Sequence, residues 1–288
     1  MANLKDIKRR IHSVESTMQI TKAMELVASS KFRHARERAE AAQPFFNATY
    51  KLMAEIAAED PYFNSQYVHK RMENGAVLLI VIAGDRGLAG GFNSNVLKMA
   101  QARIDEVKAQ GGNPIVMPIG QKAVDYFARH EVKVLKAYDH VAEHASIYLA
   151  MDMAELVLQN YERHESLQSV EMVYTSYVSP LVQEAQKIGM IPLENLAGSH
   201  PRNCAVEYEP SAEEVFDRLV PQYLAGLIYG GIVESFASEQ AARRTAMENA
   251  TDNAEEMIDS LSLLYNRARQ GAITQELTEI VGGANAQN

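Results

Sequence analysis

The stretch that decides the fold is LKDIKRRIHSVESTM, residues 4–18. Its apolar side chains recur at intervals of three and four residues, at Leu4, Ile7, Ile11, Val14 and Met18. That spacing places them along one face of a helix, as the seam of a coiled coil. No glycine precedes Gly75, and the first proline is Pro44. We therefore expect one long helix from the start of the chain, kinked at Pro44 and continuing to residue 58.

The other end of the chain carries a second long helical pattern. Ser211 and Glu214 form a capping box directly after Pro210, and the pattern runs from there to Val281, with an expected interruption at Pro221. Alanine recurs every four residues from Ala242 to Ala254, which lets two helix backbones approach closely. A helix of some 70 residues would be roughly 105 Å long. Such a length needs a partner, so the two terminal helices are predicted to pair as an antiparallel coiled coil.

The middle of the chain alternates between strand and helix patterns. The apolar run Ala76–Ala83 is typical of a strand buried on both faces. Further strands are expected over 115–119, 132–137, 170–178 and 187–193, and helices from Asn93 or Ser94 to Gln110, over 121–130 and over 142–163. The predicted fold class is therefore α/β: a long antiparallel coiled coil of the N- and C-terminal helices plus a central Rossmann-like α/β domain with a largely parallel sheet. The expected boundaries are 1–58, 75–195 and 210–283.

Composition and charge exclude several classes of protein. The formal net charge of −9 argues against a general nucleic-acid-binding protein. Cys204 is the only cysteine, so no disulfide can form within the chain. No apolar run approaches the roughly 20 residues that span a bilayer, and the basic residues near the start lead into an amphipathic stretch, not into a signal peptide. Residues 1–40 hold nine basic and five acidic residues, a local charge of +4, which favours a contact surface for an acidic or polar partner over a merely solvated face.

Few residues are arranged for chemistry. The segment Gly84–Gly91 follows a strand and precedes a helix, where a phosphate could bind, but it lacks the lysine of a Walker A loop and the dinucleotide-binding spacing. We favour a tight turn in which Asp85 and Arg86 form local hydrogen bonds or face a partner. His140 and His144 share a helical spacing, yet no third ligand completes a metal site. No catalytic, cofactor-binding or metal-binding residue is predicted.

Four motifs, in order along the chain, resemble those of one family. They are Ile20–Ala28 (ITKAMELVA), Gly84–Asn93 (GDRGLAGGFN), the pair Ser238–Arg243 (SEQAAR) with Ala250–Asn253 (ATDN), and Ile273–Glu279 (ITQELTE) with Gly283–Ala284. The chain is similar through them to the gamma subunits of rotary F-type ATP synthases, over nearly its whole length. One departure is Ala89, where many members carry cysteine, and the single cysteine also departs from the chloroplast branch with its regulatory cysteine pair.

The resemblance implies a non-catalytic rotor shaft without a cofactor. Such a shaft couples proton-driven rotation of a membrane ring of c subunits to ATP synthesis and hydrolysis in a ring of alpha and beta subunits. By resemblance, the contacts with the alpha and beta subunits are Met24, Arg243, Gln270, Thr274 and Glu276. The contacts of the foot with the epsilon subunit and the c ring are Lys31, Arg33, Tyr208 and Glu209. The resemblance also implies peripheral attachment to the cytoplasmic side of a bacterial cell membrane, through the complex.

Two other classes remain open from the residues alone. One is a nucleotide-dependent enzyme built on the α/β domain, which would bind nucleotide as an isolated chain. The other is a coiled-coil scaffold or chaperone, which would act without alpha and beta subunits.

Overall fold

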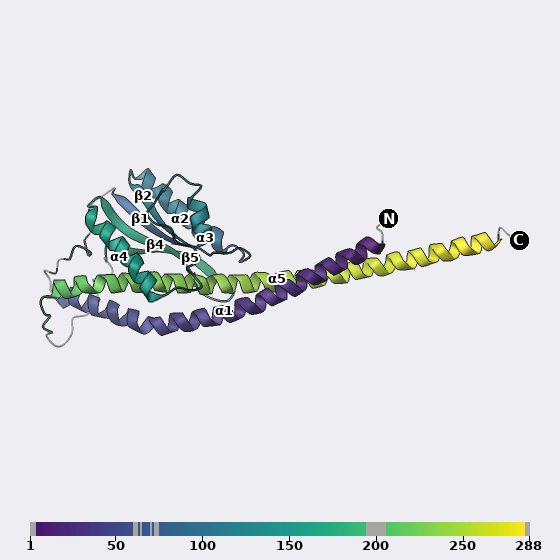
Figure 1. Cartoon of the computed structure of the whole chain (residues 1–288), viewed down its shortest axis with the longest axis horizontal. Coiled ribbons are helices and arrows are strands. Elements are labelled where there is room, and N and C mark those ends of the chain that lie inside the picture. Colours follow the sequence, from purple (N-terminus) through teal and green to yellow (C-terminus); the bar gives the residue numbers. More distant parts are fainter. Residues whose placement is uncertain are drawn as a thin grey trace. The chain divides into compact units, whose positions relative to one another are not determined.

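The computed structural model describes residues 4–59, 63, 65–69, 71, 75–193 and 206–285, with side chains of the last helix described as far as Val281. Cys204 and His200 lie outside the described residues. The chain forms two compact units, one of Met1–Ala28 with Arg243–Asn288 and one of Ser29–Ala242. The long helices α1 (Leu4–Glu59) and α5 (Ala212–Asn285) contribute residues to both units (Figure 1).

The Ser29–Ala242 unit is built on a five-stranded sheet with the order β3-β2-β1-β4-β5. The central strand β1 (Ala76–Ile82) is buried along its whole length and pairs in parallel with β2 (Asn113–Ile119) and β4 (Leu167–Tyr177). The short β3 (Lys133–Val134) is also parallel, whereas β5 (Gln183–Ile191) runs antiparallel to β4. This arrangement confirms the predicted α/β class and its largely parallel sheet.

Helices cover both faces of this sheet (Figure 1). On one face, α4 (Ile147–Arg163) and the parts of α1 and α5 within this unit pack against side chains such as Leu78, Ile80 and Ile82 of β1. On the other face, α2 (Phe92–Ala109) and α3 (Gln121–Phe127) cover Val77, Leu79 and Val81. The continuous apolar run of β1 is explained by this double burial.

Side chains of α5 take the place of a strand beside the end of β4. The pairing of β1 with β4 stops at Val173, so later backbone groups of β4 on that side have no strand partner. The Ser235 hydroxyl accepts a hydrogen bond from the Thr175 N–H at 3.1 Å, and the Ser238 hydroxyl donates to the Thr175 carbonyl at 3.2 Å. The Glu234 carboxylate accepts from the Tyr177 N–H at 3.3 Å. We call this set of contacts the α5–β4 seam.

The Met1–Ala28 with Arg243–Asn288 unit contains the outer parts of α1 and α5, which pair in antiparallel fashion. A hydrogen bond of 2.8 Å joins the buried hydroxyls of Thr21 on α1 and Thr251 on α5. Ile7 and Ala28 of α1, and Met247 and Ala254 of α5, are also buried. This pairing confirms the predicted partnership of the terminal helices within this unit.

Pro44 lies inside the continuous helix α1, and Pro221 lies inside the continuous helix α5. The prediction that the helix is interrupted at Pro221 is therefore wrong. The helix α5 continues through Pro221 because Phe216, Val220 and Leu224 around it are fully buried, and tertiary packing of this kind outweighs the lost backbone hydrogen bond. The helix α1 likewise continues through Pro44.

Other boundaries differ from the sequence-based expectation. The helix α2 begins after Gly91, and Asn93 and Ser94 do not cap it, because their side chains bond to the preceding loop. The helix α4 begins later than expected, at Ile147, where the Ser146 hydroxyl accepts a hydrogen bond from the Leu149 N–H. The expected strand over 132–137 is reduced to two residues. The three-part division at 1–58, 75–195 and 210–283 stays a prediction.

Two glycines with positive φ offer a matched test of the close approach between the carboxyl ends of β1 and β2. Gly120 has φ +92°, and a Cβ there would lie 2.0 Å from the Ala83 carbonyl oxygen, whereas Gly111 has φ +79° with open space around it. Gly111→Ala should therefore cost only the left-handed backbone strain of about 1–2 kcal/mol. Gly120→Ala adds a clash of the new Cβ with the Ala83 carbonyl, directly after β1. It should therefore lower the free energy of unfolding by clearly more than Gly111→Ala does. Urea denaturation of both variants, followed by circular dichroism, measures the difference, and equal costs would contradict the described approach of these strands.

Candidate functional site

The nine residues predicted as partner contacts separate by unit. Met24, Arg243, Gln270, Thr274 and Glu276, the predicted contacts with alpha and beta subunits, all belong to the Met1–Ala28 with Arg243–Asn288 unit. Lys31, Arg33, Tyr208 and Glu209, the predicted contacts of the foot, all belong to the Ser29–Ala242 unit. The two predicted sets thus fall on two different structural units.

Within the first set, the residues differ in how far a partner could reach them. Gln270, Thr274 and Glu276 are exposed on α5, where the Thr274 hydroxyl donates to the Gln270 carbonyl at 2.9 Å. Met24 is half-buried on α1. Arg243 is only 8% exposed, so the chain itself covers most of the side chain that was expected to face a partner. Its role as a contact stays a prediction.

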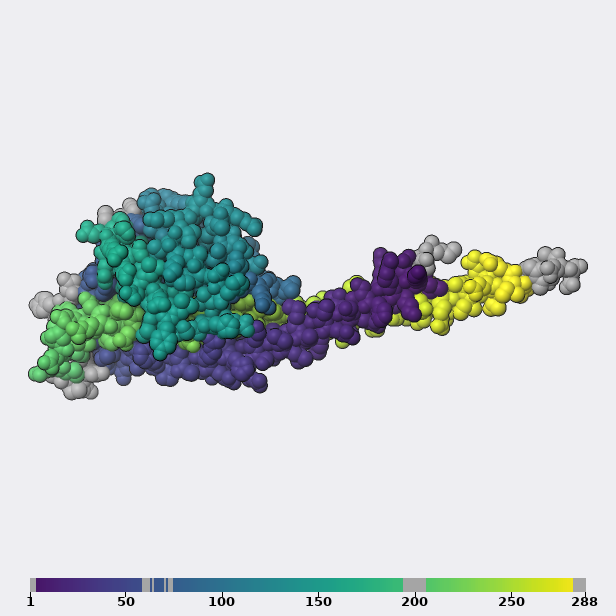
Figure 2. All heavy atoms as spheres, viewed as in Figure 1, coloured from purple at the N-terminus to yellow at the C-terminus, as the bar shows by residue number. Residues whose placement is uncertain are grey.

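The last described part of α5 carries an exposed apolar face. Ile273, Leu277, Ile280 and Val281 share one side of the helix by their spacing and are 48–67% exposed. In Figure 2 this end of α5, in yellow, runs on past the start of α1, in purple. We call these four residues the α5 apolar strip. Clustered exposed apolar side chains of this kind mark a surface for a protein partner.

Lys31 is engaged within its own unit. Its Nζ atom lies 2.6 Å from Oε1 of Glu143, in the loop before α4. The hydrogen bond from Lys31 lowers the pKa of Glu143 below its usual range. Arg33 and Glu209 are exposed, and Tyr208 is half-buried against the core of the unit. The exposed Arg33 and Glu209 are therefore the members of this set most accessible to a partner.

A second cation of α1, Arg38, was not singled out by the sequence analysis. It donates hydrogen bonds to the backbone carbonyls of Glu143 at 3.0 Å and Ala145 at 2.8 Å. Together with Lys31 it fastens α1 to the loop before α4. More than one hundred residues separate the partners along the chain, so no local pattern indicates this contact.

The glycine-rich loop is a structural turn. The Asp85 carboxylate accepts hydrogen bonds from the backbone N–H groups of Gln121 at 2.9 Å and His140 at 3.0 Å. The Asn93 side chain accepts from the Gly84 N–H and donates to the Arg86 carbonyl. Asn93 thus closes the loop locally. Asp85 instead bonds to residues 36 and 55 positions further along the chain, so the prediction of local hydrogen bonds for its side chain is wrong.

The loop also touches the helix that carries another of the four motifs. A Cβ on Gly84 would lie 2.8 Å from the carboxylate of Glu239, a residue of α5 that is 3% exposed. Gly84 and Glu239 belong to motifs that are far apart in sequence, and the fold brings them into contact. A side chain at Gly84 would require the Glu239 carboxylate to move.

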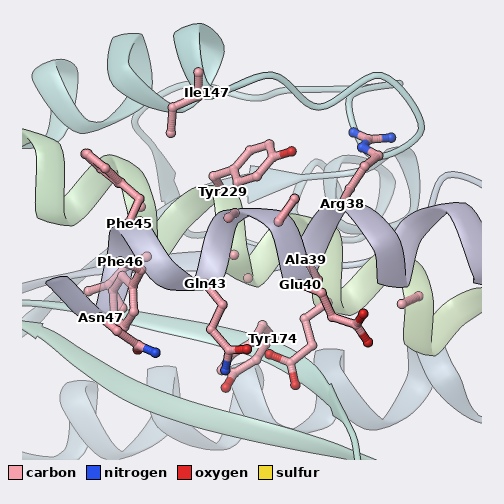
Figure 3. Close-up of a pocket in the computed structure, with 18 of the residues that line it drawn as sticks. Arg38, Ala39, Glu40, Gln43, Phe45, Phe46, Asn47, Ile147, Tyr174 and Tyr229 are labelled. Carbon is pink, nitrogen blue, oxygen red and sulfur yellow. The ribbon is translucent and has the colours of Figure 1, made fainter. Parts of the chain in front are cut away.

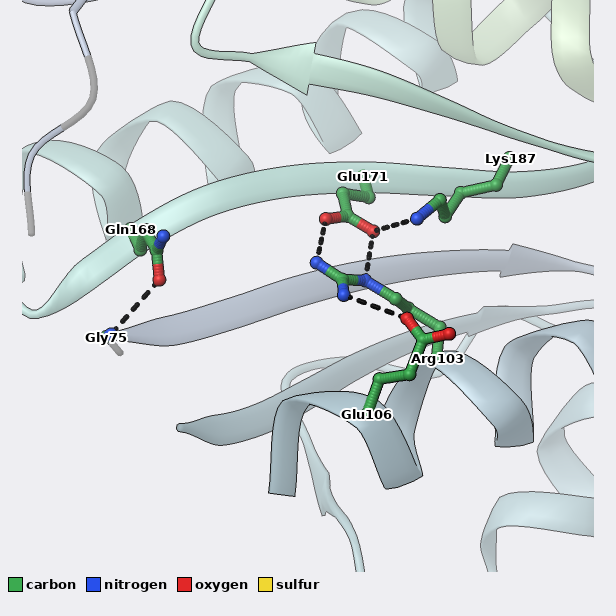
Figure 4. A network of polar contacts seen from close by, with 6 residues as sticks. All are labelled: Gly75, Arg103, Glu106, Gln168, Glu171 and Lys187. Carbon is green, nitrogen blue, oxygen red and sulfur yellow. Dashed lines mark hydrogen bonds and ion pairs between the residues drawn. The ribbon is translucent and has the colours of Figure 1, made fainter. Parts of the chain in front are cut away.

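A network of charged side chains joins α2 to β4 and β5 (Figure 4). Arg103 donates two hydrogen bonds to the Glu171 carboxylate, at 2.8 and 2.6 Å, and a third to Glu106 at 3.1 Å. These bonds raise the pKa of Arg103, with Glu171 as the main cause. Lys187 lies 3.8 Å from the same carboxylate. The two cations and the two carboxylates neutralise one another. We therefore interpret the network as a structural link that joins α2 to β4 and β5.

The described residues contain no group of three His, Cys, Asp or Glu side chains able to hold a metal ion. His140 binds Asp85 through its backbone, with φ +52°. In the same part of the chain, no helix is long and apolar enough to cross a membrane.

Comparisons with known proteins agree with this picture. The sequence profile of the ATP synthase family matches residues 3–287. The ATP synthase gamma chain of Ruminococcus albus is 55% identical over 280 residues, which cover 97% of each chain. The sodium-ion-specific ATP synthase gamma chain of Acetobacterium woodii is 40% identical over 305 residues, covering 99% of each.

Solved structures share the fold at lower identity. A chain of the mitochondrial ATP synthase of Euglena gracilis, in a structure with OSCP, F1 and the c-ring, superposes with a TM-score of 0.68 at 17% identity. The match covers 99% of this chain and 94% of that one. Likeness at this identity supports the fold alone.

The Lys31–Glu143 pair can be tested by charge reversal. Lys31→Glu places two carboxylates together, and we expect it to lower the free energy of unfolding by about 1 kcal/mol, because exposed pairs contribute about 0.2–1 kcal/mol. The swap Lys31→Glu with Glu143→Lys should recover most of the loss. The pKa of Glu143 is lowered on folding, so its contribution is present above the unfolded pKa, about 4.3, and is lost as the pH falls through the folded value.

Chemical denaturation of each variant at neutral pH and again at acidic pH measures these differences. Arg33→Glu is the matched control, since Arg33 is exposed on the same helix, and it should change stability by less than about 0.5 kcal/mol. A swap no more stable than the single reversal would contradict the pairing.

Proposed function

Because this chain belongs to the family of ATP synthase gamma chains, we propose that it is the central rotor shaft of a rotary ATP synthase. In this proposal the outer pair of helices turns inside a ring of alpha and beta subunits. The Ser29–Ala242 unit is the foot, which binds an epsilon subunit and a membrane ring of c subunits. The chain itself catalyses nothing and is attached peripherally to the cytoplasmic side of the cell membrane through the complex.

The α5 apolar strip is the observation that carries the proposal. Four apolar side chains on one helix face are exposed in the chain, and Gln270, Thr274 and Glu276 lie on the same stretch of helix. Each of the four apolar side chains would contribute roughly 1.5–3 kcal/mol to binding if a partner buried it fully. A ring of surrounding subunits is a partner of the right kind, because it would cover a helix on all sides.

The load on the shaft requires that many residues share the contact. Moving one charge through 100 mV provides about 2.3 kcal/mol. Several such steps for each nucleotide amount to roughly 10 kcal/mol, whereas an exposed ion pair contributes only about 0.2–1 kcal/mol. No single residue can carry that energy, so we propose that Met24, Arg243, Gln270, Thr274 and Glu276 share it with the α5 apolar strip.

A truncation series tests this proposal. Deleting the residues after Gly282 keeps the α5 apolar strip and should leave ATP hydrolysis and ATP-driven pumping largely intact in the assembled complex. Deleting from Gln270 onward removes the strip and should lower both, without abolishing them, because the remaining shaft still transmits torque. Both activities are measured in membranes that carry each variant.

Point variants sharpen the same test. Leu277→Gln removes an apolar contact and should lower pumping per ATP by a modest factor, whereas Glu279→Gln, two residues away and also exposed, is the matched control. The shared-contact proposal fails if deletion of the last six residues alone stops both activities, or if Leu277→Gln does.

The coupled ion in our proposal is the proton. The sodium-ion-specific relative, at 40% identity, makes sodium the specific alternative. Inverted membranes that carry the complex should therefore acidify on addition of ATP in sodium-free buffer, as followed with a pH-sensitive dye. Acidification that an uncoupler abolishes is expected, and ATP-driven transport that requires added sodium would overturn the proton assignment.

A further inference from the structure

A cavity of about 770 Å³ lies in the Ser29–Ala242 unit, between α1, α5 and the end of the sheet (Figure 3). Aromatic side chains and glycines make up much of its wall, including Phe45, Phe46, Tyr174, Tyr229, Gly226 and Gly230. Small-molecule sites have this size and this mostly apolar lining. The cavity is open to solvent on the side of Phe45, which is 54% exposed, so a ligand could enter it without rearrangement of the fold.

Three glycines of α5 line this cavity, and only one of them lies beside open space. A Cβ on Gly226 would meet the Phe46 ring at 3.3 Å, and one on Gly231 would meet Met172 at 2.7 Å, so close packing explains these two. A Cβ on Gly230 would meet nothing within 4 Å. Glycine destabilises the interior of a helix relative to alanine. Among the residues that the structure describes, no packing constraint therefore accounts for Gly230.

Some charged side chains around the cavity have a partner of opposite charge, and Arg38 has none among the described residues. Arg36 pairs with Glu40 at 3.0 Å, and the Glu234 carboxylate is held by the Ser176 hydroxyl and the Tyr177 N–H. Arg38 is held only by two backbone carbonyls, so within the described part of the chain no carboxylate neutralises its charge. The carbonyls fix the guanidinium in place and leave it electropositive.

Figure 3 shows how these groups are placed around α1. Arg38, Phe45 and Tyr229 lie toward one side of the helix, with Ile147 beyond them, and Gln43 and Tyr174 lie toward the other side. The Tyr229 hydroxyl has no hydrogen-bond partner among the described residues. A fixed cation, two aromatic rings and a hydroxyl without a partner among the described residues therefore line the same cavity.

We propose that this cavity binds a small organic anion with a flat apolar body. Its acidic group is held by Arg38, and its ring lies against Phe45 and Tyr229. A guanidinium binds carboxylate, sulfonate or phosphate oxygens through charge-assisted hydrogen bonds, and aromatic walls favour a planar body. The proposal uses none of the nine predicted partner contacts, because neither Arg38 nor Gly230 is among them.

Two fluorescent probes that differ only in charge test the proposal on the full chain. Anilinonaphthalene sulfonate carries the acidic group, and phenylnaphthylamine is the same ring system without it. We expect one molecule of the sulfonate to bind per chain, about tenfold more tightly than the neutral probe. Arg38→Gln should abolish this preference while the affinity for the neutral probe is unchanged.

Variants of the helix glycines test the location. Gly230→Leu fills the cavity and should weaken binding of both probes by about tenfold or more. Gly271→Leu is the matched control, because Gly271 is also a glycine of α5 with open space around its Cβ, and it does not line the cavity. If Gly230→Leu does not unfold cooperatively, Gly230→Ala adds a single methyl group and should weaken binding to a smaller extent.

Each outcome decides the matter. Binding that Gly230→Leu reduces and Gly271→Leu does not, with a charge preference that depends on Arg38, supports the proposal. Absence of binding, several probes bound per chain with no effect of Gly230→Leu, or a preference for the sulfonate that survives Arg38→Gln overturns it.

Discussion

The α5–β4 seam is the constraint on which the rest of the Ser29–Ala242 unit depends. Where β1 ends, the backbone of β4 would present unpaired N–H and carbonyl groups, and buried groups of this kind are costly. Ser235, Ser238 and Glu234 bind those groups at Thr175 and Tyr177. A turn of α5 about its own axis would break all of these bonds together, so the sheet has to move with the helix.

This arrangement gives residues of two family motifs a structural role. Gly84, of the glycine-rich loop, lies so close to the carboxylate of Glu239, beside Ser238 of the seam, that a Cβ on Gly84 would displace that carboxylate. Asp85 binds two further loops by their backbones, at Gln121 and His140. The loop that lies where a phosphate could bind therefore connects α5 with the segments that follow β2 and β3.

The sequence predicts what depends on local periodicity and misses what depends on distant contacts. The heptad of α1, the buried run of β1 and the cap at Ser211, whose hydroxyl accepts from the Glu214 N–H, are all visible as local patterns. The start of α4 at Ser146 was missed because the preceding residues are also compatible with helix. The bonds of Lys31 and Arg38 to the loop before α4 join residues more than one hundred positions apart, which no spacing encodes.

The α5 apolar strip has a consequence for how the protein is handled in the cell. In the proposed assembly, a newly made chain would present these side chains to water before alpha and beta subunits surround them. Exposed apolar faces promote association with the wrong partners during biogenesis. We therefore expect synthesis of this chain to be balanced against that of the subunits proposed to cover the strip, so that few unassembled copies remain.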